Sequence, residues 1–340
     1  MIKTKFQHFS HQAMGTFFEV FIAGKDKAYS QSAATEFFKE VDRLEGFFSR
    51  FDDRSEISQI NRLKPGEMLP IGVETYECLK MSFELMVETG GAFNINFRAL
   101  REKKGKKAEE KEEQTANREE SNPGVDQKNE NRLIVSDRSQ KNSACCQISW
   151  ANSEERRKWP SSFPLELAET ENGYTAIRLE VLGAHLDLDL GAIGKGYALE
   201  KAADLFADWE VSDFLVNAGQ STAYARGQKP WPVAVGGGFD FFKAGKIHLK
   251  NRALSGSGHE VKGEHIFDPR EKQPISRQLA AWVSHPSAVM ADGLSTAFMV
   301  MSLEEIETYL ERQPQLWTLV ISRDKNCYWF NRPDDFEDDI

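Results

Sequence analysis

The stretch 186–199, LDLDLGAIGKGYAL, constrains the fold of this chain more than any other segment. Its apolar run ends on Asp189, three glycines and Lys195 follow within six positions, and an amphipathic segment then begins. This order predicts a strand, a glycine turn and a helix with a lysine in its first turn. Glycine turns and helix N-termini favour phosphate oxygens, because backbone N–H groups point outward there. The pattern equally fits an ordinary strand–turn–helix connection, and its spacing matches neither common nucleotide-binding glycine motif.

Strands and helices do not alternate regularly along the rest of the chain. Apolar spacing predicts helices at 27–50, 74–89, 288–301 and 303–313, and Ser55 is placed to cap a short one. Short strands are expected at 12–24, 175–190, 213–217, 231–235, 245–248, 282–284 and 316–322, and 253–258 is interpreted as a glycine-rich loop. This order favours an α+β fold with mainly antiparallel or mixed sheets and packed helices over a doubly wound parallel sheet.

One segment differs in composition from the rest of the chain. Residues 101–160 are charged and polar with almost no apolar periodicity, so they cannot bury enough surface to offset the entropy of ordering. We interpret this segment as a disordered, solvated insertion in a single domain that spans residues 1–340.

Charge and composition exclude several classes of protein. The net charge of −10 argues against a nucleic-acid or anionic-membrane binder, since both need a basic face. No stretch offers 18 uninterrupted apolar residues, and the N-terminus has no signal core or lipid-attachment cysteine. The four cysteines show no C-x-x-C spacing, and the histidines form no H-E-x-x-H pair. We therefore expect a soluble, cytoplasmic protein without membrane insertion.

Asp292 and Thr296 are the most informative polar residues of the C-terminal half. On a helix they share one face, yet the sequence around them is apolar, and a buried carboxylate needs a partner. Asp292 either caps or salt-bridges its helix, or it forms a hard-cation site with Thr296 and the Ser295 hydroxyl. Magnesium suits so few protein ligands, because water and substrate phosphates complete its shell.

A histidine and several turn residues are weaker candidates. His265, in HIFDPR, is a side chain that can move protons near neutral pH, although a lone loop histidine is also often structural or merely exposed. Asn217 is expected to supply turn hydrogen bonds. Met14, Phe51 and 92–94 are core or turn residues by default, so physics alone predicts a magnesium–phosphate site and nothing more specific.

Seven motifs in order carry a resemblance to a known family. They are AMGT (13–16), SRFDDRSEISQIN (49–61), GAFN (91–94), LDLGAIGKGYALEKAAD (188–204), LVNAGQ (215–220), SGHEVKGEHIFDPR (257–270) and ADGLSTAFMVM (291–301). Together they resemble the ApbE family of FAD:protein FMN transferases. The resemblance implies an α+β fold that binds FAD, with Mg²⁺ assisting cleavage of the pyrophosphate. FMN then passes to a Thr or Ser hydroxyl of an acceptor flavoprotein, and AMP is released.

The resemblance also implies roles for individual residues. Metal ligands would be Asp292, Thr296 and the carbonyl of Ala192, with Ser295 as a further candidate, and either Asp292 or His265 would take the proton of the acceptor hydroxyl. FAD would be held near Met14, Phe51, Ala92, Phe93, Asn94, Asp189, Lys195, His265 and Ile266.

The chain departs from the family pattern at several positions. Asn94 stands where a carboxylate is usual, Gln220 where a glycine is usual, and His259 and Phe51 where tyrosines are common. Glu271 and Lys272 replace the usual Thr-Gly pair. Two alternatives to transfer therefore stay open: hydrolysis of FAD to FMN and AMP, and flavin binding without catalysis.

Overall fold

The computed structural model of this protein describes most of the chain. The described residues are 6–100, 163–236, 245–258, 266–275 and 277–338. The charged segment at 101–160 and the candidate His265 lie outside these ranges. The expectations of a single domain and of a disordered insertion therefore stay predictions.

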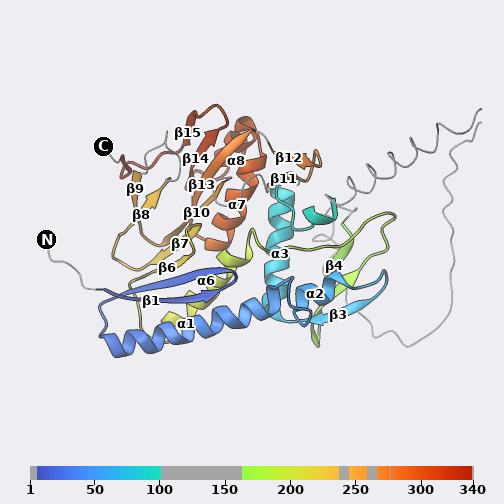
Figure 1. The fold of residues 1–340 in the computed structure, drawn as a ribbon, viewed down its shortest axis with the longest axis horizontal. Coiled ribbons are helices and arrows are strands. Elements are labelled where there is room, and N and C mark those ends of the chain that lie inside the picture. Colours follow the sequence, from blue (N-terminus) through green and yellow to red (C-terminus); the bar gives the residue numbers. More distant parts are fainter. Residues whose placement is uncertain (1–5, 101–162, 237–244, 259–265, 276, 339–340) are drawn as a thin grey trace, which may run out of the picture.

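An eight-stranded sheet forms the centre of the fold (Figure 1). Every pair of neighbouring strands in it runs antiparallel. In spatial order the strands are β1 (Phe6–Ala13), β2 (Thr16–Ala23), β6 (Phe214–Ala218), β7 (Thr222–Arg226), β10 (Arg252–Gly258), β13 (Gln278–His285), β14 (Trp317–Ser322) and β15 (Cys327–Phe330). The predicted α+β class with antiparallel sheet is confirmed.

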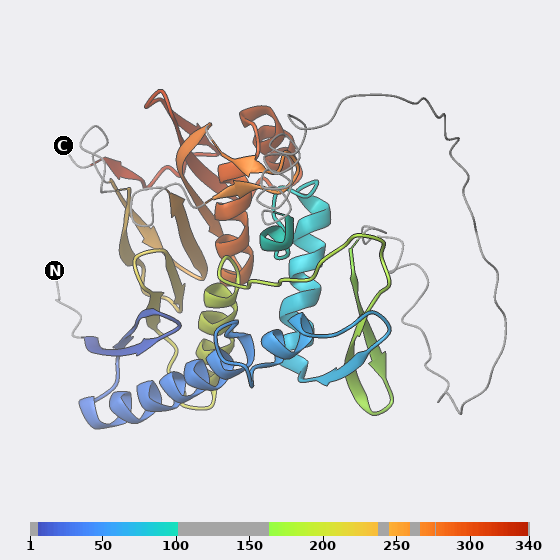
Figure 2. The same ribbon diagram turned by 45° about the vertical axis from the view of Figure 1, so that its right-hand side comes forward.

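Helices cover one face of this sheet. The long α1 (Lys27–Phe48) lies along β1, and α6 (Gly194–Asp204) and α7 (Ala288–Val300) pack on the central strands (Figure 2). The other helical elements are α2 (Glu56–Asn61), α3 (Val73–Glu88), the 3₁₀ turn η1 (Leu205–Ala207) and α8 (Leu303–Glu311). Ser55 caps α2 as expected, by accepting a hydrogen bond from the N–H of Ser58 at 3.0 Å.

Three small sheets complete the fold. On the sheet face opposite the helices, the strands β16 (Glu337–Asp338), β9 (Gly245–Leu249) and β8 (Trp231–Val235) enclose a second apolar cluster. Beside α3 lie the paired strands β3 (Met68–Ile71), β5 (Gly173–Arg178) and β4 (Leu165–Thr170) (Figure 1). The third sheet is the short pair β11 (Phe267–Asp268) and β12 (Gln273–Pro274).

The strand predicted to begin the stretch 186–199 is wrong. Residues 186–190 have no regular secondary structure and belong to none of the sheets among the described residues. Asparagine side chains take the place of neighbouring strands. Asn61 exchanges hydrogen bonds of 2.7 and 3.0 Å with the backbone of Leu188, and Asn96 accepts from the N–H of Asp187 at 2.7 Å. These partners come from distant parts of the chain, so local sequence could not show them.

The glycine-rich loop expected at 253–258 is also wrong, because these residues belong to β10. Gly256 pairs with Trp282 on β13, and a Cβ at Gly256 would lie 2.6 Å from the indole nitrogen. Glycine there makes room for an aromatic ring across the strand pair, and does not mark a turn.

None of the helices in the described ranges is long and apolar enough to cross a membrane. Cys78 is buried and Cys327 is exposed, and both are free thiols. The cytoplasmic location stays a prediction.

Candidate active site around Asp292

Asp292 lies in the second turn of α7 and is only 4% exposed. Its helix is hydrophobic almost all round, as the sequence indicated. A carboxylate in such surroundings is costly unless hydrogen bonds and an opposite charge compensate for lost hydration.

Both carboxylate oxygens of Asp292 have partners. Oδ2 accepts a 3.0 Å hydrogen bond from the N–H of Gly196 and lies 3.5 Å from the ammonium of Lys195. Oδ1 accepts from the hydroxyl of Thr222 at 3.2 Å and from that of Ser255 at 3.4 Å. The buried charge is thus held by the start of α6 on one side and by β7 and β10 on the other.

Hydroxyl groups extend this network along α7 and β10. The Ser257 hydroxyl lies 2.8 Å from that of Ser295 and 3.2 Å from that of Thr296. The Ser295 hydroxyl also donates to the backbone carbonyl of Asp292 at 2.8 Å. Sequence reasoning missed Thr222, Ser255 and Ser257, although serines two apart in a strand point to one face, and that spacing was the available signal.

Two contacts fix α6 against α7. A Cβ on Gly196 would lie 2.3 Å from the carbonyl oxygen of Ala288, so the helices approach closely only because this residue is glycine. One turn further along α6, Oε2 of Glu200 accepts from the Ser287 hydroxyl at 2.8 Å and from the N–H of Ala288 at 2.7 Å. Glu200 thereby satisfies the free N–H groups at the start of α7 and positions the helix that carries Asp292.

The turn before α6 links Asp189 to Lys195. The N–H of Gly191 donates to Oδ1 of Asp189 at 2.9 Å, and the Lys195 ammonium donates to the carbonyl of Gly191 at 2.9 Å. The guanidinium of Arg50 lies 3.3 Å from the other Asp189 oxygen. The structure therefore brings Asp189, Lys195 and Asp292 together. Side chains of both charge signs surround the glycine turn.

An exposed aromatic ring lies next to these charges. Phe51 is 84% exposed, and its ring lies 4.3 Å from the guanidinium carbon of Arg50. A large apolar side chain left in water is a ready surface for stacking of a planar ligand.

The GAFN segment offers less than expected. Ala92 and Phe93 are each 2% exposed, so both residues belong to the core. Oδ1 of Asn94 accepts from the N–H of Asn96 at 2.8 Å and shapes a turn. This segment still adjoins the site, because the N–H of Asp189 donates to the carbonyl of Ile95 at 2.8 Å.

Two further candidates lie apart from this network. Met14 occupies the tight β1–β2 turn with φ of 49°, and Ile266 is 6% exposed just before β11. Within the described ranges, no hydrogen bond links either residue to Asp292.

The groups considered for a hard cation at Asp292 are mainly neutral oxygens. No three His, Cys, Asp or Glu side chains of the described residues gather in a way that would hold a metal ion. The candidate donors are the Asp292 carboxylate, the Thr296 hydroxyl and the carbonyl of the half-buried Ala192, all of them oxygens. Such a set suits Mg²⁺, which keeps much of its shell for water and phosphate.

Burial also shifts two titratable groups near α7. Burial raises the pKa of the Cys78 thiol, and the nearby Asp292 charge adds to the effect, so this thiol is no nucleophile. Burial lowers the pKa of His285 to about 4. Its neutral ring accepts a 2.8 Å hydrogen bond at Nδ1 from the N–H of Ser287, the residue that caps α7.

Known proteins are similar to this chain in sequence. The model of the ApbE family matches residues 14–320. A protein of Klebsiella pneumoniae strain 342 named FAD:protein FMN transferase is 32% identical over 143 residues, which are 38% of this chain and 41% of that protein. A Rhodobacter capsulatus protein of the same name is 32% identical over 132 residues, 35% of this chain and 25% of that protein. The similarity thus spans less than half the length of these curated relatives.

Solved structures share the fold. The apo form of the flavinyl transferase ApbE of Pseudomonas stutzeri superposes with a TM-score of 0.67 at 20% identity, covering 98% of this chain and 94% of that one. The ApbE protein of Thermotoga maritima gives 0.67 at 21% identity, with 95% and 96% covered. At such low sequence identity, the structural similarity establishes the fold alone. The family model, in contrast, matches most of the sequence. The chain belongs to the ApbE family.

Proposed function

We propose that this chain transfers FMN from FAD to a threonine or serine hydroxyl of an acceptor flavoprotein, with AMP as the second product. The observation that carries the proposal is the buried Asp292 carboxylate, 3.5 Å from the Lys195 ammonium at the start of α6. The carboxylate would attract a metal ion and the ammonium would attract a pyrophosphate, so their closeness suits a reaction that needs both. The name of the relatives, FAD:protein FMN transferase, supports the same reaction.

Mg²⁺ is the proposed cofactor. The Asp292 carboxylate, the Thr296 hydroxyl and the Ala192 carbonyl would hold it. Ser295 is a weaker ligand candidate, because its hydroxyl already donates to the carbonyl of Asp292 and the residue is 0% exposed. When bound, Mg²⁺ neutralises negative charge on the pyrophosphate oxygens.

The remaining candidates would bind FAD. Lys195 adds positive charge beside the pyrophosphate, and the exposed ring of Phe51 offers a stacking surface above Arg50. Asp189 orients the glycine turn through its bond to the Gly191 N–H. Further contacts are proposed from Met14, from residues 92–94 and from His265 and Ile266.

In the proposed reaction, the acceptor hydroxyl oxygen bonds to the FMN phosphorus. The bond from that phosphorus to the bridging oxygen breaks, and AMP leaves with its electron pair. The hydroxyl proton needs an acceptor. Asp292 is the proposed metal ligand and both of its oxygens already accept hydrogen bonds, so we assign the proton to another group. His265, outside the described residues, is then the proposed proton acceptor.

The test uses the full chain, FAD, Mg²⁺ and a purified flavoprotein that normally carries threonine-linked FMN and has been produced without flavin. Mass spectrometry should show one FMN added to the acceptor, and chromatography should show an equal amount of AMP. Asp292→Asn should lose the activity. Asp324→Asn, which alters an exposed turn, should retain it.

Two other outcomes would contradict transfer. Free FMN and AMP without any acceptor protein would indicate hydrolysis. Tight FAD binding with no product would indicate a flavin-binding protein that has lost catalysis.

A further inference from the structure

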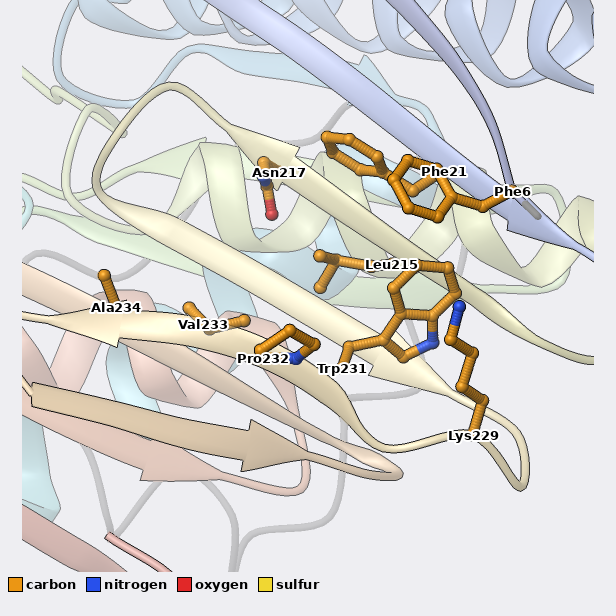
Figure 3. Close-up of a pocket in the computed structure, with 9 residues that line it drawn as sticks. All are labelled: Phe6, Phe21, Leu215, Asn217, Lys229, Trp231, Pro232, Val233 and Ala234. Carbon is orange, nitrogen blue, oxygen red and sulfur yellow. The ribbon is translucent and has the colours of Figure 1, made fainter. Parts of the chain in front are cut away.

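A pocket of about 480 Å³ opens on the sheet face opposite the Asp292 site (Figure 3). Leu215 and Asn217 of β6 line it, whereas Val216 between them belongs to the core under the helices. Alternating strand residues point to opposite faces, so the sheet separates this pocket from α6 and α7. Its volume lies within the range of small-molecule sites.

Aromatic rings form one wall of the pocket. The ring of Phe6 meets that of Phe21 edge-on with centroids 5.7 Å apart, and it meets Trp231 in the same way at 6.0 Å. β1, β2 and β8 each contribute one ring, as Figure 3 shows. These rings together offer an aromatic surface to a flat molecule.

Two polar atoms on lining residues are buried without a hydrogen-bond partner among the described residues. They are Oδ1 of Asn217, an acceptor, and Nε1 of Trp231, a donor. Trp231 as a whole is only 3% exposed. Buried polar atoms are nearly always paired in proteins, and neither atom is exposed in this structure. A small movement of the lining side chains would let a ligand supply the missing partner of each atom.

A lysine adds charge at the same place. The ammonium of Lys229 lies 4.0 Å from the ring centroid of Trp231 and 5.3 Å from that of Phe6. Within the described ranges, no carboxylate lies within 4.0 Å of this ammonium. Burial lowers the pKa of Lys229, and only the more distant charge of Asp213 opposes that effect. An anionic group would restore the stability of the charged form.

We propose that this pocket binds small aromatic carboxylates that carry a ring N–H or hydroxyl. The carboxylate pairs with the Lys229 ammonium and accepts from the indole N–H of Trp231. The ring lies against Phe6 and Phe21, and its N–H or hydroxyl donates to Oδ1 of Asn217. No group of the Asp292 site takes part, so the inference stands whether or not the chain transfers FMN.

Isothermal titration calorimetry on the full chain tests this with three related probes. Indole-3-acetate has the ring, the N–H and the carboxylate, whereas 1-methylindole-3-acetate lacks the N–H and indole lacks the carboxylate. We expect indole-3-acetate to bind at least about tenfold more tightly than either of the other two, because each lost contact contributes roughly one factor of ten.

Matched variants locate the binding. Lys229→Gln should lower the affinity for indole-3-acetate about tenfold, so that this probe binds no more tightly than indole. Asn217→Leu should remove its advantage over the N-methyl probe. Lys250→Gln, at an exposed lysine in the turn after β9, should bind like the unaltered protein. Thermal unfolding of each variant checks that the fold is retained.

Three results would overturn the proposal. They are equal affinities for the three probes, affinity unchanged in a folded Lys229→Gln variant, and no heat of binding at millimolar probe. Displacement of the probe by FAD would place it in the flavin site and would also contradict the proposal.

Discussion

The backbone N–H of Gly196 donates a 3.0 Å hydrogen bond to Oδ2 of Asp292, across the crossing of α6 and α7. The two residues are 96 positions apart in sequence. A Cβ at position 196 would lie 2.8 Å from the Cβ of Asp292, so the bond depends on glycine. This contact joins the glycine turn and the buried carboxylate into one site.

Gly196→Ala should push the helices apart, because the new methyl group would also lie 2.3 Å from a backbone oxygen of Ala288. We expect a loss of about 1–3 kcal/mol in the free energy of unfolding, measured by urea titration. Flavin transfer, measured by mass spectrometry, should fall as Asp292 loses its N–H partner. Gly194→Ala is the matched control, since its Cβ meets only ordinary contacts at 3.5 and 3.8 Å. Equal losses in both variants would show that the close approach is not the cause.

Thr222→Val should remove the hydroxyl that donates to Oδ1 of Asp292 and leave the shape unchanged. The expected cost is about 1–2 kcal/mol of unfolding free energy, because a buried charged acceptor loses a bond. Thr75→Val is the matched control, because it removes a buried threonine hydroxyl of a different kind. The hydroxyl of Thr75 is buried and has no hydrogen-bond partner among the described residues, so its removal should be neutral or stabilising. If both variants behave alike in urea titrations, the Thr222 hydroxyl does not stabilise Asp292.

Stability should fall as the pH is lowered from about 6.5 to about 4. Burial, aided by the Arg252 charge, lowers the pKa of His285 from 6.5 to about 4 in the folded protein. Between these values the unfolded chain binds the proton and the folded chain does not, so unfolding is favoured as pH falls. Urea midpoints measured across this range should show the decline.

His285→Asn should flatten part of that decline. His248→Asn, on β9 in another sheet, is the matched histidine control. An unaltered curve in the His285 variant would rule out this histidine as the source. Because Ser287 caps α7 and donates to the His285 ring, the helix that carries Asp292 would loosen as the ring is protonated.

Lys195→Gln should separate substrate binding from metal binding. Loss of the ammonium near the proposed pyrophosphate position should raise the KM for FAD about tenfold. The same ammonium lies 3.5 Å from Asp292, so its loss cannot weaken the attraction of Asp292 for a cation. The Mg²⁺ concentration for half-maximal rate should therefore stay the same or fall, and Lys39→Gln, at an exposed position of α1, serves as control. A higher Mg²⁺ requirement with an unchanged KM would contradict this assignment.

Local patterns determined the helices of this protein and its class of fold. The apolar spacing of 288–301 predicted α7, and the Ser55 cap predicted α2, because both depend on residues within one or two turns. The motifs also predicted the family, since short motifs survive where the rest of the sequence changes. A feature whose hydrogen bonds and contacts lie within one or two turns can be predicted from the local sequence.

Only the tertiary structure decided how the site is built. The stretch 186–190 looks like a strand, yet the partners of Asp187 and Leu188 are the side chains of Asn96 and Asn61, and that of Asp189 is the carbonyl of Ile95. The serines of 255–257 look like loop residues, yet they belong to β10, where Ser255 donates to Asp292 and Ser257 contacts the hydroxyl of Ser295. In each case hydrogen-bond partners come from chain segments far away in sequence. The sequence by itself therefore determined that Asp292 needs partners, and the packing of α6, α7, β7 and β10 decided which groups those partners are.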